Sequence, residues 1–211
     1  MSVIVTASNG WVHKPIVEAD AADFMMCFKD YPLSQGASSI TYEERVHFFS
    51  ATLQRNEANT LPLTEEASPG VVRVYGLFKP DGVLVGAFTY KFFTPGEAYI
   101  LHYTIHPDHR NQGHTRAFRG LGLVGLFGYY NITTFKAKLE ASSTFPAMEA
   151  LKSFWDSGGA NLEAGDSMST EGRLDKEGNS VALKLMTATR AQVETNITTD
   201  PDWKDITYTF S

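Results

Sequence analysis

The stretch between Tyr99 and Thr115 constrains the fold more than any other part of the sequence, because an extended run changes into a helical one within it. Its first part is rich in β-branched and aromatic residues and predicts a strand from Glu97 to Ile105. A polar loop containing proline and glycine follows, and an apolar helix is expected from Thr115 to about Tyr130. The chain must therefore join a strand to a helix through a short exposed turn.

The segments on either side of this stretch predict an α/β sheet with helices on its faces. Two extended runs precede it, from Val71 to Lys79 and from Val83 to Phe92, and Pro80-Asp81-Gly82 joins them as a hairpin turn. Helices are expected at residues 20–31, 41–53 and 145–156, and further strands at 132–139, 180–187 and 205–210. Residues 56–70 predict a loop, and the polar stretch from Gly165 to Gly178 predicts a hairpin or mobile loop. Since no linker divides the chain, we expect one domain over residues 1–211, with a C-terminal extension from about residue 188.

Composition and charge exclude several classes of protein. The 211 residues are 43% hydrophobic with a net charge of −6 and no basic cluster, so a globular protein that does not bind nucleic acid is expected. No run approaches the ~20 apolar residues of a membrane helix, and the N-terminus lacks the pattern of a secretory signal. We therefore expect no membrane association and a cytoplasmic location. The single cysteine, Cys27, excludes an intrachain disulfide, and its place on the apolar face of the first helix favours a buried, inert thiol.

The loop between the strand and the helix has the features of a phosphate cradle. Backbone N–H groups in the first turn of a helix lack intrahelical partners, and the helix dipole there favours anions. Gly113 lets the backbone approach a phosphate closely, while Arg110 and Arg116 supply charge-assisted contacts. The alternative is an ordinary connection between a strand and a helix, with no ligand.

The same residues resemble the signature loop of the GNAT family of acyltransferases, in which a strand ending in V-x-P leads into R/Q-x-x-G-x-G/A. Here Ile105-His-Pro107 and Arg110-Asn-Gln-Gly113-His-Thr115 occupy that pattern in register. The sequence departs from it at Thr115, which replaces the final Gly or Ala, and at His114, which replaces an apolar residue. The order of the expected elements, over about Pro15 to Thr187, also resembles that of the family.

The resemblance implies a GNAT-like mixed, mostly antiparallel sheet flanked by helices, with a V-shaped splay between two central strands. It implies that the strand from Glu97 to Ile105 parts from the next strand to admit the pantetheine arm of acetyl-CoA, which is the expected co-substrate. It also implies that backbone amides of about Asn111 to Arg116 bind the CoA pyrophosphate. The predicted donor-binding residues are Ile105, Arg110, Asn111, Gln112, Gly113, His114, Thr115 and Arg116.

Transfer of an acyl group to an amine requires a neutral amine, so a general base is expected. Alternation along the predicted strand places Ile100, His102 and Thr104 on one face. Many GNAT enzymes carry a carboxylate base on this strand, and Ile100 lies near its expected place. We predict His102 as the base, because an unperturbed imidazole pKa of about 6.5 suits the role. A structural role for His102 is the alternative, and Glu97 is a weaker candidate.

The family's usual general acid is a tyrosine about four residues before the glycine that ends the last core helix. Phe154 and Trp155 occupy that neighbourhood, and neither side chain can protonate a thiolate, so packing is their favoured role. The sequence thus predicts an N-acyltransferase that transfers an acetyl group from acetyl-CoA to a primary amine by direct attack. One alternative is a catalytically inactive GNAT-fold protein with a binding or structural role, such as a viral virion component. Another is an unrelated α/β domain.

Two further patterns bear on ligands and partners. His106, His109 and His114 lie around the loop, but they have no carboxylate pattern beyond Asp108, so we predict no metal site. The predicted helix after the loop also carries four glycines, which lower helix propensity and indicate close approach of a neighbour. They are Gly120, Gly122, Gly125 and Gly128. Packing on the sheet and an interface with a second copy or a protein partner both remain open, as does docking through the C-terminal tail.

Overall fold

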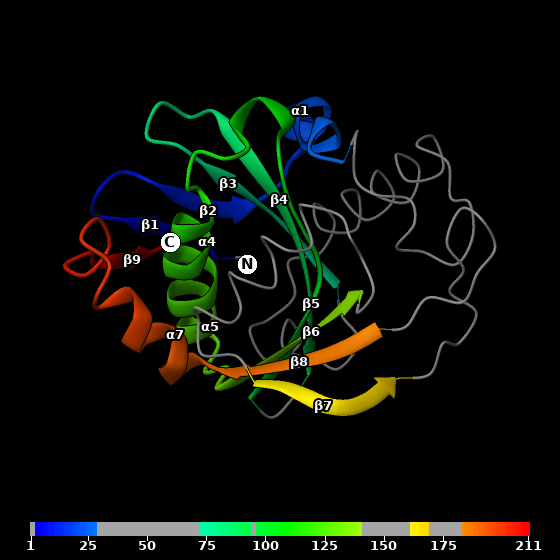
Figure 1. Ribbon diagram of the computed structural model, residues 1–211. Helices are drawn as coiled ribbons and strands as arrows, with labels where there is room; N and C mark the ends of the chain where they lie inside the picture. Colours follow the sequence, from blue (N-terminus) through cyan, green and yellow to red (C-terminus); the bar gives the residue numbers. More distant parts are fainter. Residues whose placement is uncertain (1–2, 29–71, 94–95, 141–160, 169–182) are drawn as a thin grey trace.

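The computed structural model describes residues 3–28, 72–93, 96–140, 161–168 and 183–211 (Figure 1). The strands in these ranges are β1 (Val5–Ala7), β2 (Val12–Pro15), β3 (Val72–Phe78), β4 (Leu84–Phe93), β5 (Glu97–Ile105), β6 (Thr134–Glu140), β7 (Asn161–Met168), β8 (Leu183–Thr189) and β9 (Tyr208–Phe210). The helices are η1 (Glu18–Asp20), α1 (Ala21–Met26), η3 (Pro107–His109), α4 (Thr115–Phe118), η4 (Arg119–Leu126), α5 (Phe127–Tyr129) and α7 (Arg190–Ile197).

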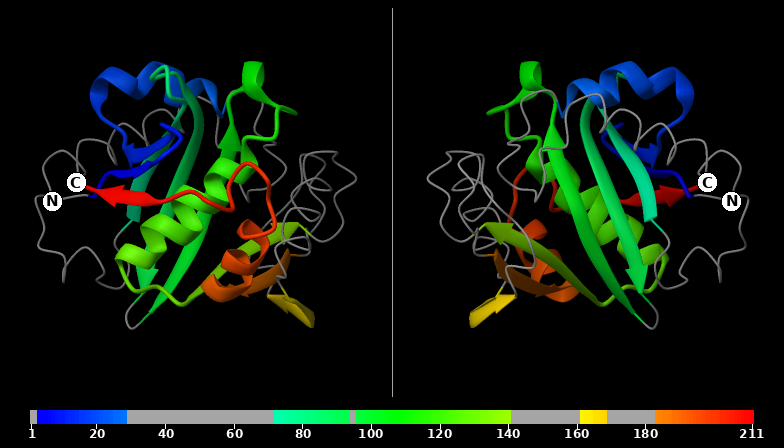
Figure 2. Two further views of the ribbon diagram at one scale, coloured as in Figure 1. Left: turned by 90° about the vertical axis from the view of Figure 1, so that its left-hand side faces the viewer. Right: turned by 90° about the vertical axis from the view of Figure 1, so that its right-hand side faces the viewer.

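All the described strands belong to one sheet, in the order β7-β8-β6-β5-β4-β3-β2-β1-β9. Every neighbouring pair is antiparallel except β5 and β6, which run parallel. The predicted mixed, mostly antiparallel sheet flanked by helices is therefore confirmed. Figure 2 shows α4, η4 and α5 lying as one continuous rod across a face of the sheet.

The predicted meander of three strands is also confirmed, with ends within one residue of those expected. Its first turn is fixed by backbone geometry, because Gly82 has a φ of +84°, a value that favours glycine. The Asp81 carboxylate accepts a hydrogen bond from the Val83 N–H at 3.1 Å. Local turn chemistry therefore sets the register of β3 against β4.

Alternate residues of the sheet supply two apolar clusters on its opposite faces. Tyr75 and Leu77 belong to the larger cluster, which packs under η4, whereas Val74 belongs to the smaller one around α1. In the smaller cluster, Phe24 and Cys27 are fully buried, as the predicted apolar stripe requires. Helix α1 ends at Met26, so the predicted helix over residues 20–31 is confirmed only for this part.

The side chain of His13, on β2, is buried and makes polar contacts with β3 and β4. Its Nδ1 lies 3.1 Å from the Gly76 carbonyl oxygen, and its Nε2 lies 2.8 Å from the Tyr90 hydroxyl. Burial lowers the pKa of His13 to about 3, although the hydrogen bond with Gly76 raises it. The neutral ring therefore donates from Nδ1 to Gly76 and accepts the Tyr90 hydroxyl proton at Nε2.

The predicted helix from Thr115 to Tyr130 is present, but its middle section, η4, has π-helical hydrogen bonding. Its glycines make room for other parts of the same chain. A methyl group added at Gly120 would lie 2.6 Å from the Trp203 ring, and one at Gly125 would lie 2.7 Å from Val5. Both distances are below van der Waals contact, so these glycines serve packing within the chain.

The C-terminal tail, for which a docking role was open, packs against its own chain. Helix α7 begins with a capping box, in which Thr189 and Gln192 exchange hydrogen bonds. Its buried residues Val193 and Ile197 belong to the larger cluster. Figure 1 shows the tail passing α4 to reach β9, which pairs with β1 at the edge of the sheet.

Several elements differ from the predictions, and some predicted elements lie outside the described residues. The strands β1, β2 and β7 and the helix α7 were not predicted, and the second half of β7 lies where a loop from Gly165 was expected. Strand β9 is shorter than predicted, whereas β6 agrees to within two residues. Strand β8 ends two residues later than predicted, and residues 180–182 of that prediction lie outside the described residues. The helices expected at 41–53 and 145–156 and the loop at 56–70 lie outside the described residues.

Across the described ranges, no helix is both long and apolar enough to cross a membrane.

Candidate functional site

The central strands β5 and β6 part halfway along β5. They pair in parallel only from Glu97 to Ile100, opposite residues 134–137. Beyond that point β6 pairs with β8 as far as Glu140, while β4 is the one described strand that still pairs with β5. The predicted splay between two central strands is therefore confirmed, because the second half of β5 no longer pairs with β6.

A β-bulge in β5 lies where the splay begins. Tyr90 of β4 pairs with Ile100, and the next residue, Thr89, pairs with His102, so Leu101 is the extra residue. Ile100 consequently belongs to the cluster under η4, whereas Thr104 donates its hydroxyl to the Cys27 carbonyl on the other face, at 2.8 Å. The prediction that Ile100 and Thr104 share a face is wrong, because one inserted residue reverses the alternation.

The loop after β5 contains two residues with positive φ angles. Asn111 and Gly113 have φ angles of 61° and 76°, and His114 returns to a helical conformation. Alternation of this kind forms a concave nest of amides that suits an anion. Within the described part of the chain, the N–H groups of residues 111–114 have no hydrogen-bond acceptor.

The conformation of Gly113 is required by the backbone and not by crowding. A methyl group added at this position would have no described atom within 4 Å. Glycine is therefore needed here for its positive φ, and among the described residues nothing crowds this position of the nest. This arrangement fits the predicted phosphate cradle at the start of the helix, which continues without a break from α4 through α5.

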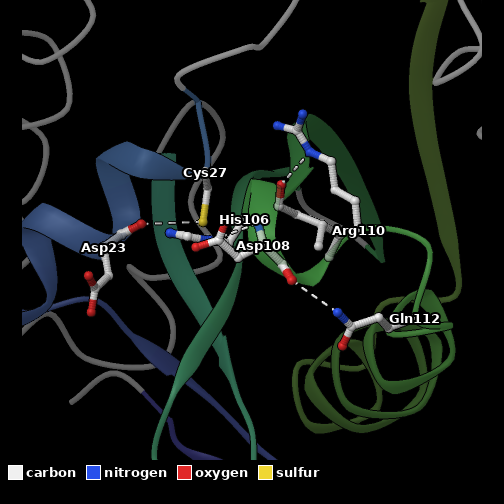
Figure 3. A network of polar contacts seen from close by, with 7 residues as sticks. Asp23, Cys27, His106, Asp108, Arg110 and Gln112 are labelled. Atoms are coloured by element: carbon white, nitrogen blue, oxygen red, sulfur yellow. Dashed lines mark hydrogen bonds and ion pairs between the residues drawn. The ribbon is translucent and has the colours of Figure 1, made fainter.

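Side chains tie the loop to itself and to the strand (Figure 3). Arg110 donates from Nε to the Ile105 carbonyl at 3.0 Å, which closes the loop over the end of β5. Gln112 donates from Nε2 to the Asp108 carbonyl, also at 3.0 Å. The predicted site residues Ile105, Arg110 and Gln112 thus lie together, and these contacts hold the nest in shape.

Three histidines line the loop as expected. The His106 ring lies 5.5 Å from that of His109, which lies 6.0 Å from that of His114. Trp11, from the β1–β2 hairpin, contacts His114 at 5.2 Å between ring centres. Burial and then nearby positive groups, including Lys79, lower the pKa of His109 and His114. Among the described residues, no group of three potential ligands is placed to hold a metal ion.

Arg116, predicted to contact phosphate, is held by the C-terminal tail. Its Nε lies 3.3 Å from a carboxylate oxygen of Asp200, and its Nη1 lies 3.2 Å from one of Asp202. Arg119 lies one turn further along the same face of the helix, half-buried. Arg119 was missed in the sequence, although its spacing from Arg116 was a usable signal. No sequence signal marked the tail carboxylates, because they lie more than eighty residues from Arg116 in the chain.

The remaining candidates differ in how far the structure describes them. His102 has a defined backbone position in β5 opposite Thr89, while its side chain lies outside the described residues, as do Phe154 and Trp155. Glu97, the weaker candidate base, forms an ion pair of 2.9 Å with Lys136. Burial raises the pKa of the Cys27 thiol to about 12, and the neighbouring Arg110 lowers it by less. These surroundings fit the prediction of a buried, inert thiol at Cys27.

Comparison with known proteins identifies this fold. No family model matches the sequence, and no curated protein matches it. Among solved structures, spermidine N-acetyltransferase from Vibrio cholerae in complex with CoA and spermine is similar, with a TM-score of 0.63 and 11% identity. That similarity covers 87% of this chain and 98% of the other. Mycobacterium smegmatis RimJ in complex with CoA-disulfide has a TM-score of 0.62 and 17% identity, covering 90% and 87% of the two chains.

The splayed sheet, the loop after β5 and these similarities together show the GNAT acetyltransferase fold. The family resemblance read from the loop sequence is thereby confirmed for the fold. At identities this low, the likeness extends to the arrangement of the chain and leaves its activity to be argued from its own residues.

Proposed function

We propose that this protein is an N-acyltransferase that transfers an acetyl group from acetyl-CoA to a primary amine. The observation that carries the proposal is the nest of N–H groups at residues 111–114, which opens directly after the half of β5 that has left β6. Such a nest at the start of a helix favours a phosphate group. The two similar structures contain CoA or CoA-disulfide, and one of them also contains spermine, which supports this donor and an amine acceptor.

In the proposed reaction, the amine nitrogen attacks the thioester carbonyl carbon. The carbon–sulfur bond breaks, an amide forms, and CoA leaves as a thiolate. His102 is the proposed base that accepts the proton lost by the amine nitrogen. Its backbone lies just beyond the bulge, in the part of β5 that no longer pairs with β6. Water is the proposed proton source for the thiolate, since neither the Phe154 ring nor the Trp155 indole is acidic enough to protonate sulfur.

The donor-binding part of the proposal assigns the pyrophosphate to the amides of residues 111–114. The sequence prediction extended to the Arg116 amide, but that N–H donates to the Gly113 carbonyl at 3.1 Å. Arg110 would act chiefly by holding the loop, because its Nε is bonded to the Ile105 carbonyl. A charge added inside the nest should therefore abolish binding, whereas the same charge on another exposed turn should not. Gly82 provides the matched position, because it also has a positive φ and no described atom within 4 Å of an added methyl group.

Calorimetric titration with acetyl-CoA tests this assignment in the wild-type protein and in Gly113→Glu and Gly82→Glu. We expect micromolar binding by the wild type and by Gly82→Glu, and at least a ~10-fold weaker affinity in Gly113→Glu, because a carboxylate replaces favourable phosphate contacts with repulsion. Absence of binding by the folded wild-type protein would overturn the proposal. Equal loss in both variants would show that strain, and not the nest, is responsible.

One observation favours the alternative of a catalytically inactive GNAT-fold protein. Asp200 and Asp202 neutralise Arg116 beside the nest, which weakens its attraction for phosphate. Mass spectrometry of a panel of primary amines, incubated with acetyl-CoA and the protein, distinguishes the two. An acetylated product that disappears with His102→Ala supports the enzyme, whereas binding of acetyl-CoA without any product supports a binding or structural role.

The proposal also includes a single domain, and a cytoplasmic location that the lone cysteine favours. A homo-oligomer or protein partner that used the glycine-rich helix or the tail would need a surface away from Gly120 and Gly125. Those two positions are filled by Trp203, Tyr208 and Val5 of the same chain.

A further inference from the structure

Arg73, the second residue of β3, is a cation buried on the apolar face of the sheet. Only 3% of the residue is exposed. Side chains alternate along a strand, so Arg73 shares a face with Tyr75 and Leu77, which belong to the larger cluster under η4. Its partner across the strands, Tyr90, belongs to the same cluster. The guanidinium therefore lies among apolar and aromatic groups.

The charge of Arg73 lacks a partner within the described ranges. Its Nε and Nη2 atoms are buried, and neither has a hydrogen-bond acceptor among the described residues. By contrast, Arg116 forms an ion pair with Asp200, and Arg190 forms one with Glu194. A guanidinium stays charged at any ordinary pH, and a buried charge without a counter-charge is strongly unfavourable. An anion beside Arg73 would remove this penalty.

The two nitrogens without acceptors define the shape of that anion. Nε and Nη2 lie on one edge of the planar guanidinium, where their N–H bonds run nearly parallel. This edge matches the two oxygens of a carboxylate, which it binds in a bidentate manner. A halide ion has no second atom to meet the second N–H group, so the geometry favours a carboxylate.

The surroundings limit the charge and the size of the anion. Arg73 and His13 are the basic side chains that are buried within the described residues. Burial lowers the pKa of His13 to about 3, so its ring is neutral and Arg73 supplies the single positive charge. A monoanion balances that charge, whereas a second negative charge would be left without a partner. The low exposure of Arg73 also favours a ligand of a few atoms.

We propose that Arg73 binds a small monocarboxylate, such as formate or acetate, through Nε and Nη2 on the apolar face of the sheet. The site is separate from the nest. Lys79, at the other end of β3, is the residue close enough to lower the pKa of His109 and His114. Six residues of extended chain, roughly 20 Å, lie between Lys79 and Arg73. Carboxylate binding at Arg73 therefore does not rest on the proposed function.

Thermal unfolding of the full chain near neutral pH tests this site, with sodium acetate exchanged for sodium chloride at constant ionic strength. A ligand that binds only the folded state stabilises it, so the wild-type Tm should rise by about 4 °C at an acetate concentration ~10 times Kd. Arg73→Met should lose this rise. Arg73→Lys, which keeps the charge without the paired N–H groups, should keep only a small part of it. Arg190→Met is the matched control and should respond as the wild type does, because Arg190 is already paired with Glu194.

Equal Tm values for the wild type in acetate and in chloride would overturn the proposal. An equal rise in the wild type and in Arg73→Met would also overturn it, because acetate would then act elsewhere. If Arg73→Met does not fold by circular dichroism, the NMR line width of carbon-13-labelled acetate decides between the wild type and Arg73→Lys. Broadening that is stronger with the wild type supports the site, whereas equal line widths contradict it.

Discussion

The middle of the central helix and the loop before it both depend on glycine, for opposite reasons. At Gly120 a methyl group would collide with Trp203 and Tyr208, at 2.6 and 2.7 Å. At Gly113 it would have no described neighbour, and only the φ of 76° requires glycine. The first position is fixed by packing and the second by backbone conformation. The packed middle of the central helix therefore contributes to stability, whereas the exposed loop before it can contact a ligand.

The largest expected effect comes from His13, deep in the packed region. The unfolded chain binds a proton at His13 near pH 6.5, whereas the folded protein does so only near pH 3. Because the unfolded state binds more protons between these values, the free energy of unfolding falls as the pH is lowered through this window. We expect a loss of about 3 kcal/mol from His13 between pH 6.5 and pH 4.

Urea unfolding at several pH values measures this loss in the wild type and in His13→Gln. The glutamine amide can donate toward Gly76 and accept from Tyr90, but it does not titrate in this range. The variant should therefore lose less stability than the wild type on acidification. Parallel pH profiles in the two proteins would show that His13 is protonated without unfolding, and that the packed region is less tight than its burial indicates.

A methyl group at Gly120 tests the packing directly. Gly120→Ala should lower the free energy of unfolding by about 2 kcal/mol, because Trp203 and Tyr208 must move and this outweighs the better helix propensity of alanine. Gly128→Ala is the matched control, since its new methyl group would meet only Arg190, at 3.5 Å. Chemical denaturation should show the control unchanged or up to about 1 kcal/mol more stable. Equal changes in stability in the two variants would contradict a packing role that is specific to Gly120.

A smaller change in stability is expected at the loop. Gly113→Ala should cost about 1 kcal/mol, from a positive φ that alanine tolerates poorly. Gly82→Ala should cost a similar amount, because its φ is +84°. Thermal unfolding compares the two, and titration with acetyl-CoA should then show weaker binding for Gly113→Ala alone. Similar affinities in both variants would contradict the assignment of the nest.

The smallest effect is expected at Glu97, where β5 is still paired on both sides. Its ion pair with Lys136 is partly exposed, so Glu97→Gln should cost about 0.5 kcal/mol. The same variant separates the two candidate bases in an amine acetylation assay. Retention of the acetylation rate favours His102, whereas a loss that grows smaller at high pH would move the role of base to Glu97.

Local patterns predicted much of the fold, because turns and periodicity act over a few residues. The meander, the loop and the central helix were found from Pro80-Asp81-Gly82, from alternation and from helical spacing. The short strands β1 and β2 escaped detection, since three or four residues carry little periodicity. The bulge at Leu101 was equally hidden, because it depends on how β5 pairs with β4 and not on its own residues.

For the candidate site, the sequence indicated which residues form the nest but not what surrounds it. Gly113 and Arg110 were recognisable from their spacing within one loop. The partners of Arg116 come from the tail, and nothing near Asp200 in the sequence marks it as part of a site. Contacts between distant segments are set by the tertiary fold, so they were beyond any local pattern.

The pairing of β9 with β1 has a consequence for the order of folding. Trp203 and Tyr208, which cover Gly120, lie far along the chain from β1, so a ribosome adds them long after it has added β1. Until those residues emerge, the groove along the helix stays open to water and the edge of β1 has no partner on that side. Closing contacts across so much of the chain is slow, so this part of the fold should form only after Tyr208 has left the ribosome.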